Sequence, residues 1–290
     1  MFRTAVLSIL FLFLFKYPVY SQNIDATRKL ALELAGEKNH PAAAIEYRRL
    51  ALMEKTPEKR AGYFWAAAHQ YWQNDNYQLT QKMLDNAENA DPEILNSALL
   101  LRAEAALSAN KETEAAFYSK SILNSTDSPI NYKRTAARQY ARAMLIKKGR
   151  LEDKSLLKNE HTDDRRLLAD IYNYEHGRDK SPRLGGILGL IPGLGYAYAG
   201  EYANAVRSLL LNSIFIFGMV ETAENEHWGS FAAITFFELT WYTGSIYGGI
   251  DATHRYNKGR LNQCITPLEE SGRFSPDSSS VPIISLKFGF

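Results

Sequence analysis

The chain has 290 residues, of which 46% are hydrophobic and 23% are charged, with 34 basic and 32 acidic side chains and one cysteine. This length suits one large domain or two ordinary ones. Because the charges nearly balance, no overall field attracts nucleic acid, and we expect no nucleic-acid partner. The single cysteine excludes an internal disulfide and a multi-cysteine metal site. A mean hydropathy of −0.31 excludes a chain that lies mostly within a membrane.

Residues 1–21 are predicted to be a secretory signal peptide. Arg3 precedes an apolar run over 5–15, which is too short to cross a hydrocarbon core of ~30 Å at about 1.5 Å per residue. Residues 19–21 offer a cleavage site. The alternative is an uncleaved anchor, which Lys16 favours. If the signal is cleaved, the rest of the chain faces an extracytoplasmic space.

Residues 22–180 are predicted to form helical hairpins. The segment is nearly free of proline and glycine and is rich in residues that favour helix. In residues 61–92, small and large apolar residues alternate along two successive helical faces, and Pro92 closes the unit. The small residues Ala43, Thr80 and Ala115 recur at intervals of 37 and 35 residues (80 − 43 and 115 − 80).

These spacings resemble the tetratricopeptide repeat, whose period is about 34 residues, over roughly half of the chain. Flanking units over 30–57 and 99–129 match less well, and a degenerate fourth helix pair is expected over 132–148 and 152–174. A generic helical bundle is the alternative. The resemblance implies a concave surface that binds a peptide or a partner helix. The candidate groove residues, which otherwise only solvate a loop, are Gln70, Gln73, Asn74 and Asn76.

A basic stripe follows the third unit. No acidic residue occurs between Asp127 and Glu152. Residues four apart share a helix face, so three of the arginines align. Such a stripe suits anionic lipid headgroups or an acidic partner, and the alternative is a solvated face. Its members are Lys133, Arg134, Arg138, Arg142, Lys147, Lys148 and Arg150.

Residues 181–260 contain three apolar runs and are predicted to form a membrane-embedded unit of two or three helices. The run over 229–250 is long enough to span, and the run over 203–220 is barely so if Arg207 extends to the interface. The run over 184–199 is broken by Pro192 and Gly193, which favours a re-entrant or interfacial segment.

Charges around these runs bear on topology. The loop over 221–227 has three acids and no lysine or arginine, which fits the outside of the membrane. Residues 254–260 are basic, which fits the inside. With the repeats outside, this pattern requires three crossings, the first made by the broken run. If that run does not cross, the charge rule and the signal peptide disagree.

A second resemblance lies in residues 191–202. This segment is similar to the P-G-x-G-x-x-Y-x-G stretch of small bacterial membrane domains that have two or three helices. The motif positions are Pro192, Gly193, Gly195, Tyr198 and Gly200. Such a domain behind helical repeats is a familiar arrangement in bacterial envelope proteins. The resemblance implies a membrane location and no activity.

Three further residues of this unit are singled out. Gly244 and Gly248 are four apart, so they form a small-residue face for self-association or for packing within the chain. Glu238 is a carboxylate within an apolar run, where it is costly and usually faces protein or water. For Glu238, a structural role as a hydrogen-bonding group is favoured over a role in proton transfer. The expected partners of Glu238 are Arg207, Asn212, Tyr196 and Tyr198.

The remaining sequence carries no recognisable chemistry. Residues 261–290 are predicted to be a flexible tail with a short terminal strand over 283–290. There is no nucleotide-binding loop and no serine-hydrolase elbow, and Cys264 lacks a nucleophile signature. Glu221, Glu224 and His227 do not match a zinc or di-iron pattern. We therefore expect no enzyme, no cofactor and no metal.

The sequence thus predicts an all-α protein with a tetratricopeptide-like solenoid and a membrane-embedded hairpin unit. The leading hypothesis is an extracytoplasmic adaptor in the bacterial cell envelope. It binds a protein partner through the repeats and contacts lipid, with the choice of inner or outer membrane open. The alternative is a component of a transport or membrane-insertion complex in which Glu238 and Arg207 are functional.

Overall fold

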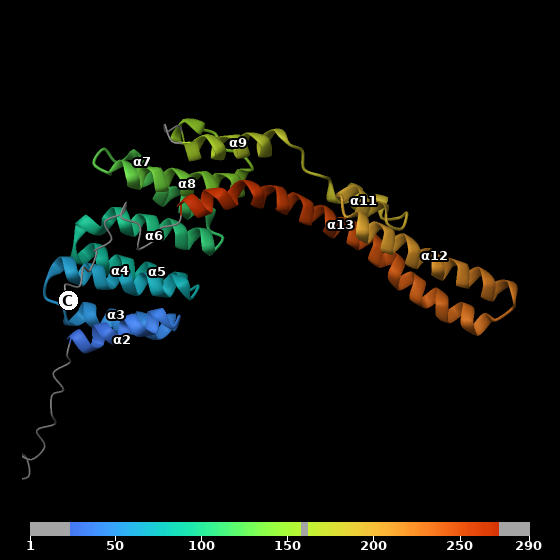
Figure 1. Ribbon diagram of the computed structural model, residues 1–290, viewed down its shortest axis with the longest axis horizontal. Coiled ribbons are helices and arrows are strands. Elements are labelled where there is room, and N and C mark those ends of the chain that lie inside the picture. Colours follow the sequence, from blue (N-terminus) through green and yellow to red (C-terminus); the bar gives the residue numbers. More distant parts are fainter. Residues whose placement is uncertain (1–23, 158–161, 273–290) are drawn as a thin grey trace, which may run out of the picture. The chain divides into compact units, whose positions relative to one another are not determined.

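The computed structural model describes residues 24–157 and 162–272 (Figure 1). This part of the chain contains twelve α-helices, two short 3-10 helices and no strand, which confirms the all-α prediction for the described residues. The predicted signal peptide and terminal strand lie outside them. The helices divide into two compact units at Ser128 and Pro129, rather than at the predicted boundary of residue 180.

The N-terminal unit is a row of helices in which each packs against the next along the chain. Proline starts α3 and α4 within their first turn, where its missing N–H is not needed. The elements are α2 (Ile24–Gly36), α3 (His40–Met53), α4 (Pro57–Gln73), α5 (Tyr77–Ala90), η1 (Pro92–Ile94), α6 (Leu95–Ser108) and α7 (Glu112–Asn124).

Three hairpins of this unit share one turn geometry. The turns after α2, α4 and α6 each contain one residue with left-handed backbone, Lys38, Asp75 and Asn110, with φ of 59°, 54° and 54°. These residues are 37 and 35 positions apart (75 − 38 and 110 − 75), the same intervals as the small-residue markers of the sequence. Each of those markers is fully buried. The described part of this unit therefore contains three helical hairpins whose turns recur at these intervals.

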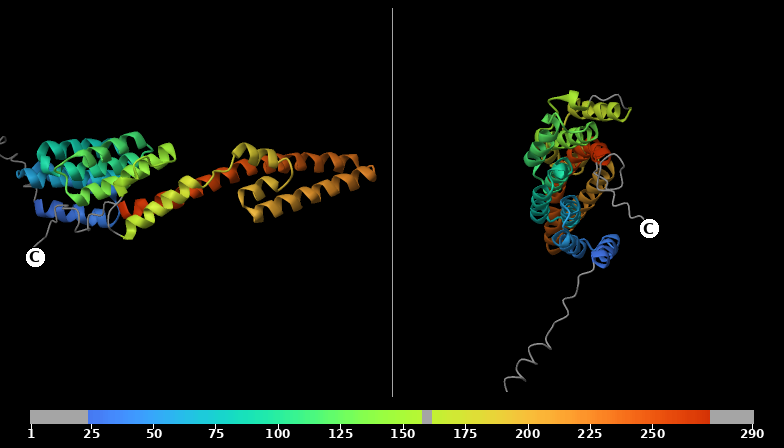
Figure 2. Two further views of the ribbon diagram at one scale, coloured as in Figure 1. Left: turned by 90° about the horizontal axis from the view of Figure 1, so that it is seen from above. Right: turned by 90° about the vertical axis from the view of Figure 1, so that its left-hand side faces the viewer.

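The C-terminal unit is built on one long helix, α13, of 45 residues. The helices α8 to α12 all pack against it, and α12 runs beside its first half in both views (Figure 1, Figure 2). The elements are α8 (Ile130–Lys148), η2 (Lys154–Leu157), α9 (Thr162–His176), α10 (Pro182–Leu188), α11 (Leu194–Ala199), α12 (Tyr202–Glu224) and α13 (Trp228–Gly272).

Two sequence predictions are wrong in this unit. α8 and α9 do not form a fourth hairpin with each other, because both pack on the C-terminal part of α13, where Cys264 and Leu268 are buried. The predicted tail from residue 261 begins as helix, since residues 261–272 continue α13 through Pro267. A proline in a helix removes one backbone hydrogen bond, but packing of Leu268 holds the last turns in place.

Candidate functional site

The hairpin of α12 and α13 has an apolar exterior. Among the described helices, α12 is long and apolar enough to cross a membrane. Only 11% of the most apolar 18-residue segment of α12 is buried, whereas a core helix of a soluble protein is mostly buried. The large apolar side chains exposed on α12 are Tyr202, Val206, Leu209, Leu210, Leu211, Ile214, Ile216, Phe217 and Val220. Those exposed on the facing part of α13 are Trp228, Phe236, Phe237, Leu239, Trp241 and Tyr247.

The interior of the same hairpin is polar. Asn212, Glu238 and Ser245 are 2%, 7% and 2% exposed. The Asn212 amide donates to the Ser208 carbonyl oxygen at 2.7 Å, and the Ser208 hydroxyl donates to the Ser245 hydroxyl at 3.1 Å. We call Ser208, Asn212, Glu238 and Ser245 the polar seam. Within the described residues, Oδ1 of Asn212 and Oε2 of Glu238 are buried without a hydrogen-bond partner.

Glycines allow α10, α11 and α13 to cross closely beside the polar seam. A Cβ added to Gly249 would lie 2.5 Å from the Gly185 carbonyl oxygen and 3.0 Å from Cα of Gly195. Gly193, with φ of 86°, donates its N–H to the Ser245 hydroxyl at 3.3 Å. The motif glycines Gly193 and Gly195 therefore allow backbone segments of the same chain to pack closely. The sequence predicted a close approach of helices but not which segments meet.

The two glycines of the predicted self-association face differ. Gly248 is covered by the Tyr196 ring of the same chain, whereas no atom lies within 4 Å of a Cβ added to Gly244. The other motif residues have structural places. Gly200, with φ of 92°, ends α11, and the Tyr198 hydroxyl accepts a hydrogen bond from the Ser181 N–H at 3.0 Å. Pro192 stands in the turn between α10 and α11.

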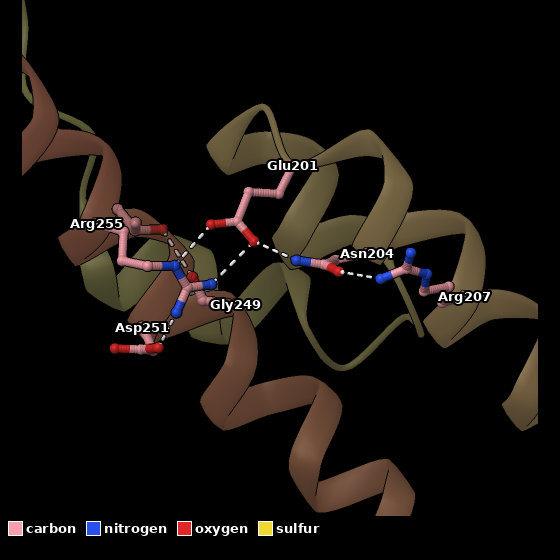
Figure 3. A network of polar contacts seen from close by, with 7 residues as sticks. Glu201, Asn204, Arg207, Gly249, Asp251 and Arg255 are labelled. Carbon is pink, nitrogen blue, oxygen red and sulfur yellow. Dashed lines mark hydrogen bonds and ion pairs between the residues drawn. The ribbon is translucent and has the colours of Figure 1, made fainter.

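A network of charged and polar groups connects α12 and α13 at the end of the hairpin that is opposite the connecting loop (Figure 3). The Glu201 carboxylate accepts hydrogen bonds from Nε and Nη2 of Arg255 at 2.8 and 2.9 Å, and from the Asn204 amide at 2.6 Å. Arg255 also pairs with Asp251. The hydrogen bond from Arg255 is the main cause that lowers the pKa of Glu201. Arg207 donates to Asn204 at 3.4 Å, so its guanidinium belongs to this network and not to Glu238.

The broken apolar run folds as two short helices. α10 has seven residues and α11 has six, and both pack against α13. A helix needs about 20 residues to span a bilayer. Neither helix is long enough to cross a bilayer by itself, and α12 is the candidate span among the described helices.

Two arginines of the basic stripe, Arg138 and Arg142, contact the end of α13. Arg138 donates to the Ser271 carbonyl oxygen at 2.5 Å, and Arg142, 7% exposed, lies 3.6 Å from the Glu269 carboxylate. Cations are favourable at a helix C-terminus because the last carbonyls carry partial negative charge. This part of the stripe therefore stabilises the end of α13, whereas Lys147, Lys148 and Arg150 are exposed.

Two of the four predicted groove residues, Asn74 and Asn76, cap helices at their own turn. The Gln70 side-chain oxygen lies 2.8 Å from Nδ1 of His40. Asn76 caps α5 by accepting from the Leu79 N–H at 3.1 Å, and Asn74 ends α4. Gln73 is exposed. Asparagine at a helix cap satisfies backbone groups that would otherwise lack partners, so these positions follow from local chain geometry.

A pocket of about 240 Å³ lies beside this turn and was not predicted. The Trp72 indole N–H donates to the Ser108 hydroxyl at 3.1 Å, and the Lys111 ammonium lies 4.0 Å from the Tyr77 ring centroid. The aromatic residues at the end of α4 and the start of α5 are its only signal in the sequence. It is lined by Trp72, Asp75, Tyr77, Ala105, Ser108 and Ala109.

Two buried titratable groups lie elsewhere. The His69 ring stacks on Trp65 and is tilted against Trp72, with ring centroids at 5.5 and 5.3 Å, and burial lowers its pKa to about 4. The imidazole is therefore neutral at pH 7. Burial raises the pKa of Cys264 to about 12, so the thiol is not a nucleophile at neutral pH.

Within the described residues, no group of three or more His, Cys, Asp or Glu side chains is placed to hold a metal ion. Comparison with known protein families, curated proteins and solved structures finds no match to this chain. The argument for function therefore depends on the geometry of the two units.

Proposed function

We propose that the protein is a membrane-anchored helical scaffold. In this proposal, α12 and the first half of α13 insert into a bilayer, and the three hairpins of the N-terminal unit bind a protein partner. One observation carries the anchor: the α12–α13 hairpin is apolar outside and polar inside. Exposing that apolar surface to water would be unfavourable by about 25 cal/mol per Å². In lipid the same arrangement is favourable, because the polar groups face protein.

The dimensions of the hairpin support insertion. α12 has 23 residues, about 35 Å at the usual rise per residue, and a hydrocarbon core is ~30 Å thick. Trp228 begins α13 at the tip, where an indole suits the membrane interface. The charged network of Glu201 and Arg255 lies at the opposite end of the hairpin, where it would meet the other interface.

With two crossings, both ends of the hairpin lie on one side of the membrane. The charge rule favours the cytoplasm for the basic end, whereas the signal peptide favours an extracytoplasmic side. We place the repeats outside, in a bacterial cell envelope, because long domains are translocated with little regard to their charge. The resemblance to tetratricopeptide repeats and to the glycine-rich bacterial membrane domain supports this assignment.

Replacement of Ile214 by arginine tests the anchor. Ile214 is 66% exposed on α12. Arginine in the middle of a spanning helix is unfavourable by about 3 kcal/mol. We expect wild-type protein to resist carbonate extraction from membranes and the Ile214→Arg fraction in the pellet to fall several-fold. Phe117→Arg, at a residue that is 67% exposed on α7, should behave as wild type. Removal of wild-type protein by carbonate contradicts the anchor.

The partner-binding half of the proposal centres on the pocket beside Trp72. Its aromatic rings and the exposed Asp75 carboxylate suit a basic or long aliphatic side chain. A photo-crosslinking residue at Ala109 should capture a partner in intact cells, and one at exposed Lys29 should not. Asp75→Asn keeps a side chain that tolerates left-handed backbone and should reduce capture. Equal capture at both positions contradicts a partner site in this pocket.

The alternative proposal, a component of a transport or insertion complex, finds support in buried Glu238. Its second expected residue, Arg207, is hydrogen-bonded to Asn204 in the network of Figure 3. Glu238 and Arg207 therefore do not act as a pair in this arrangement, and a transport role would depend on the polar seam alone.

A further inference from the structure

The polar seam contains two buried acceptor oxygens that lack a donor, Oδ1 of Asn212 and Oε2 of Glu238. We propose that Asn212 and Glu238 form a binding site for one monovalent cation, a proton or a sodium ion, between α12 and α13. This inference rests on the proposed insertion of the hairpin into a membrane. It adds to the scaffold a site that binds an ion from solution.

The register of the two helices places both residues in the same stretch of the helix interface, within about one helical turn of each other. Ser208 meets Ser245 at 3.1 Å, and a Cβ added to Gly218 would lie 3.4 Å from Cδ1 of Ile234. On α12, Asn212 lies between Ser208 and Gly218. On α13, Glu238 lies between Ile234 and Ser245. Both side chains are more than nine-tenths buried, so both point into the helix interface.

This level is close to the middle of the proposed membrane segment. Asn212 is twelve residues before the end of α12 at Glu224, and Glu238 is ten residues after the start of α13 at Trp228. At the usual helical rise these intervals are about 18 and 15 Å from the tip, half of a ~30 Å core. Water is scarce at that depth, so a buried carboxylate there needs a partner from the protein or an ion.

Among the described residues, no positively charged side chain lies at this level of the two helices. Between residues 208 and 218, α12 has no charged or titratable side chain. Between 234 and 245, α13 has only Glu238 and Tyr242, whose hydroxyl donates to the Leu190 carbonyl oxygen at 2.8 Å. α10 and α11, with Arg183, Tyr196 and Tyr198, meet α13 from Ser245 onward, and α8 and α9 meet its C-terminal part.

The chemistry of the two oxygens selects a cation. A carboxylate is an acceptor only, and one of the two N–H groups of the Asn212 amide donates to the Ser208 carbonyl oxygen, on the side of the amide away from Oδ1. A proton on Oε2 would turn that oxygen into a donor toward Oδ1 of Asn212. A sodium ion would take both oxygens as ligands, since hard cations prefer carboxylate and carbonyl oxygen. Either ion makes the seam electrically neutral, which lipid requires.

Carbodiimide labelling of the full chain in liposomes tests the site, because carbodiimide modifies protonated carboxyl groups in apolar surroundings. In choline chloride at pH 7, we expect Glu238 to be labelled at least about tenfold faster than exposed Glu224. A difference of one pH unit between the protonation midpoints of the two carboxyl groups changes the ratio of their protonated fractions about tenfold. Protection by NaCl assigns sodium as the ion, and no protection assigns the proton. Labelling of Glu238 as slow as that of Glu224 overturns the proposal.

Variants separate the ion site from a purely structural role. Asn212→Leu has similar volume but no acceptor oxygen, and should shift the pH midpoint of Glu238 labelling by about one unit or abolish NaCl protection. Leu210→Ala, at a residue 57% exposed, should leave labelling unchanged. An unchanged profile in Asn212→Leu overturns the site. If Glu238→Gln stays in membranes after carbonate extraction, the anchor is independent of the ion site.

Discussion

Replacing Gly249 by alanine is expected to lower the free energy of unfolding of the α10–α13 region by about 2–3 kcal/mol. The added Cβ would lie 2.5 Å from the Gly185 carbonyl oxygen and 3.0 Å from Cα of Gly195. Both contacts are with backbone, which cannot rotate away as a side chain can. The measurement is thermal unfolding of the purified protein in detergent, monitored as the fraction of the protein that stays monodisperse at each temperature.

Gly244 provides a matched control in the same helix. No atom lies within 4 Å of a Cβ at this position, so Gly244→Ala should be neutral or stabilise helix α13 by up to about 1 kcal/mol. The same variant reports on self-association. If a second copy packs on this face, Gly244→Ala changes the oligomeric state while the monomer fold remains. Equal destabilisation by the two alanine variants would contradict the packing argument.

Replacing Arg102 by leucine is expected to destabilise the N-terminal unit by about 2–3 kcal/mol, the range for hydrogen bonds to charged groups. The Arg102 guanidinium of α6 lies 2.6 Å from Asp85 and 3.1 Å from Glu88 of α5, and its side chain is 9% exposed. It also donates to Gln81. The variant leaves Glu88, 27% exposed, without its cation. Denaturant unfolding of the full chain measures the loss, in a background with Trp228→Phe and Trp241→Phe so that the fluorescence comes from Trp65 and Trp72 alone.

The exposed pair of Lys29 and Glu33 is the control for Arg102. Its side chains are 80% and 57% exposed and its N–O distance is 3.9 Å. Such pairs contribute between zero and about 1 kcal/mol, so Lys29→Leu should change stability little. If Arg102→Leu and Lys29→Leu have the same small effect, the ion cluster between α5 and α6 does not hold neighbouring hairpins together.

The repeating hairpins were predictable because their signal is local. The spacing of Ala43, Thr80 and Ala115 predicts where helices touch, and all three are fully buried. Asn76 was predicted as a groove residue, and in the structure its side chain caps α5. Capping is decided by the backbone of the turn, whereas a groove depends on residues from several hairpins. The pocket beside Trp72 combines residues from α4 to α6, so spacing alone does not reveal it.

The basic stripe shows the limit of a one-helix argument. Helical spacing correctly aligned Arg138 and Arg142, but it could not say what the face meets. Their partners, Ser271 and Glu269, lie more than a hundred residues later in a segment predicted to be a flexible tail. That prediction failed because Pro267 and neighbouring polar residues suggest a loop, while burial of Leu268 stabilises helix.

The sequence by itself determined the helical content, the hairpin period and the apolar character of α12, because these depend on residue type and spacing along one helix. Only the tertiary structure decided that the broken run folds as two short helices, that Arg207 pairs with Asn204, and that Asn212 and Glu238 are both buried. These features arise from contacts between helices distant in sequence. Residue type gives the chemistry of each side chain, and packing decides what it meets.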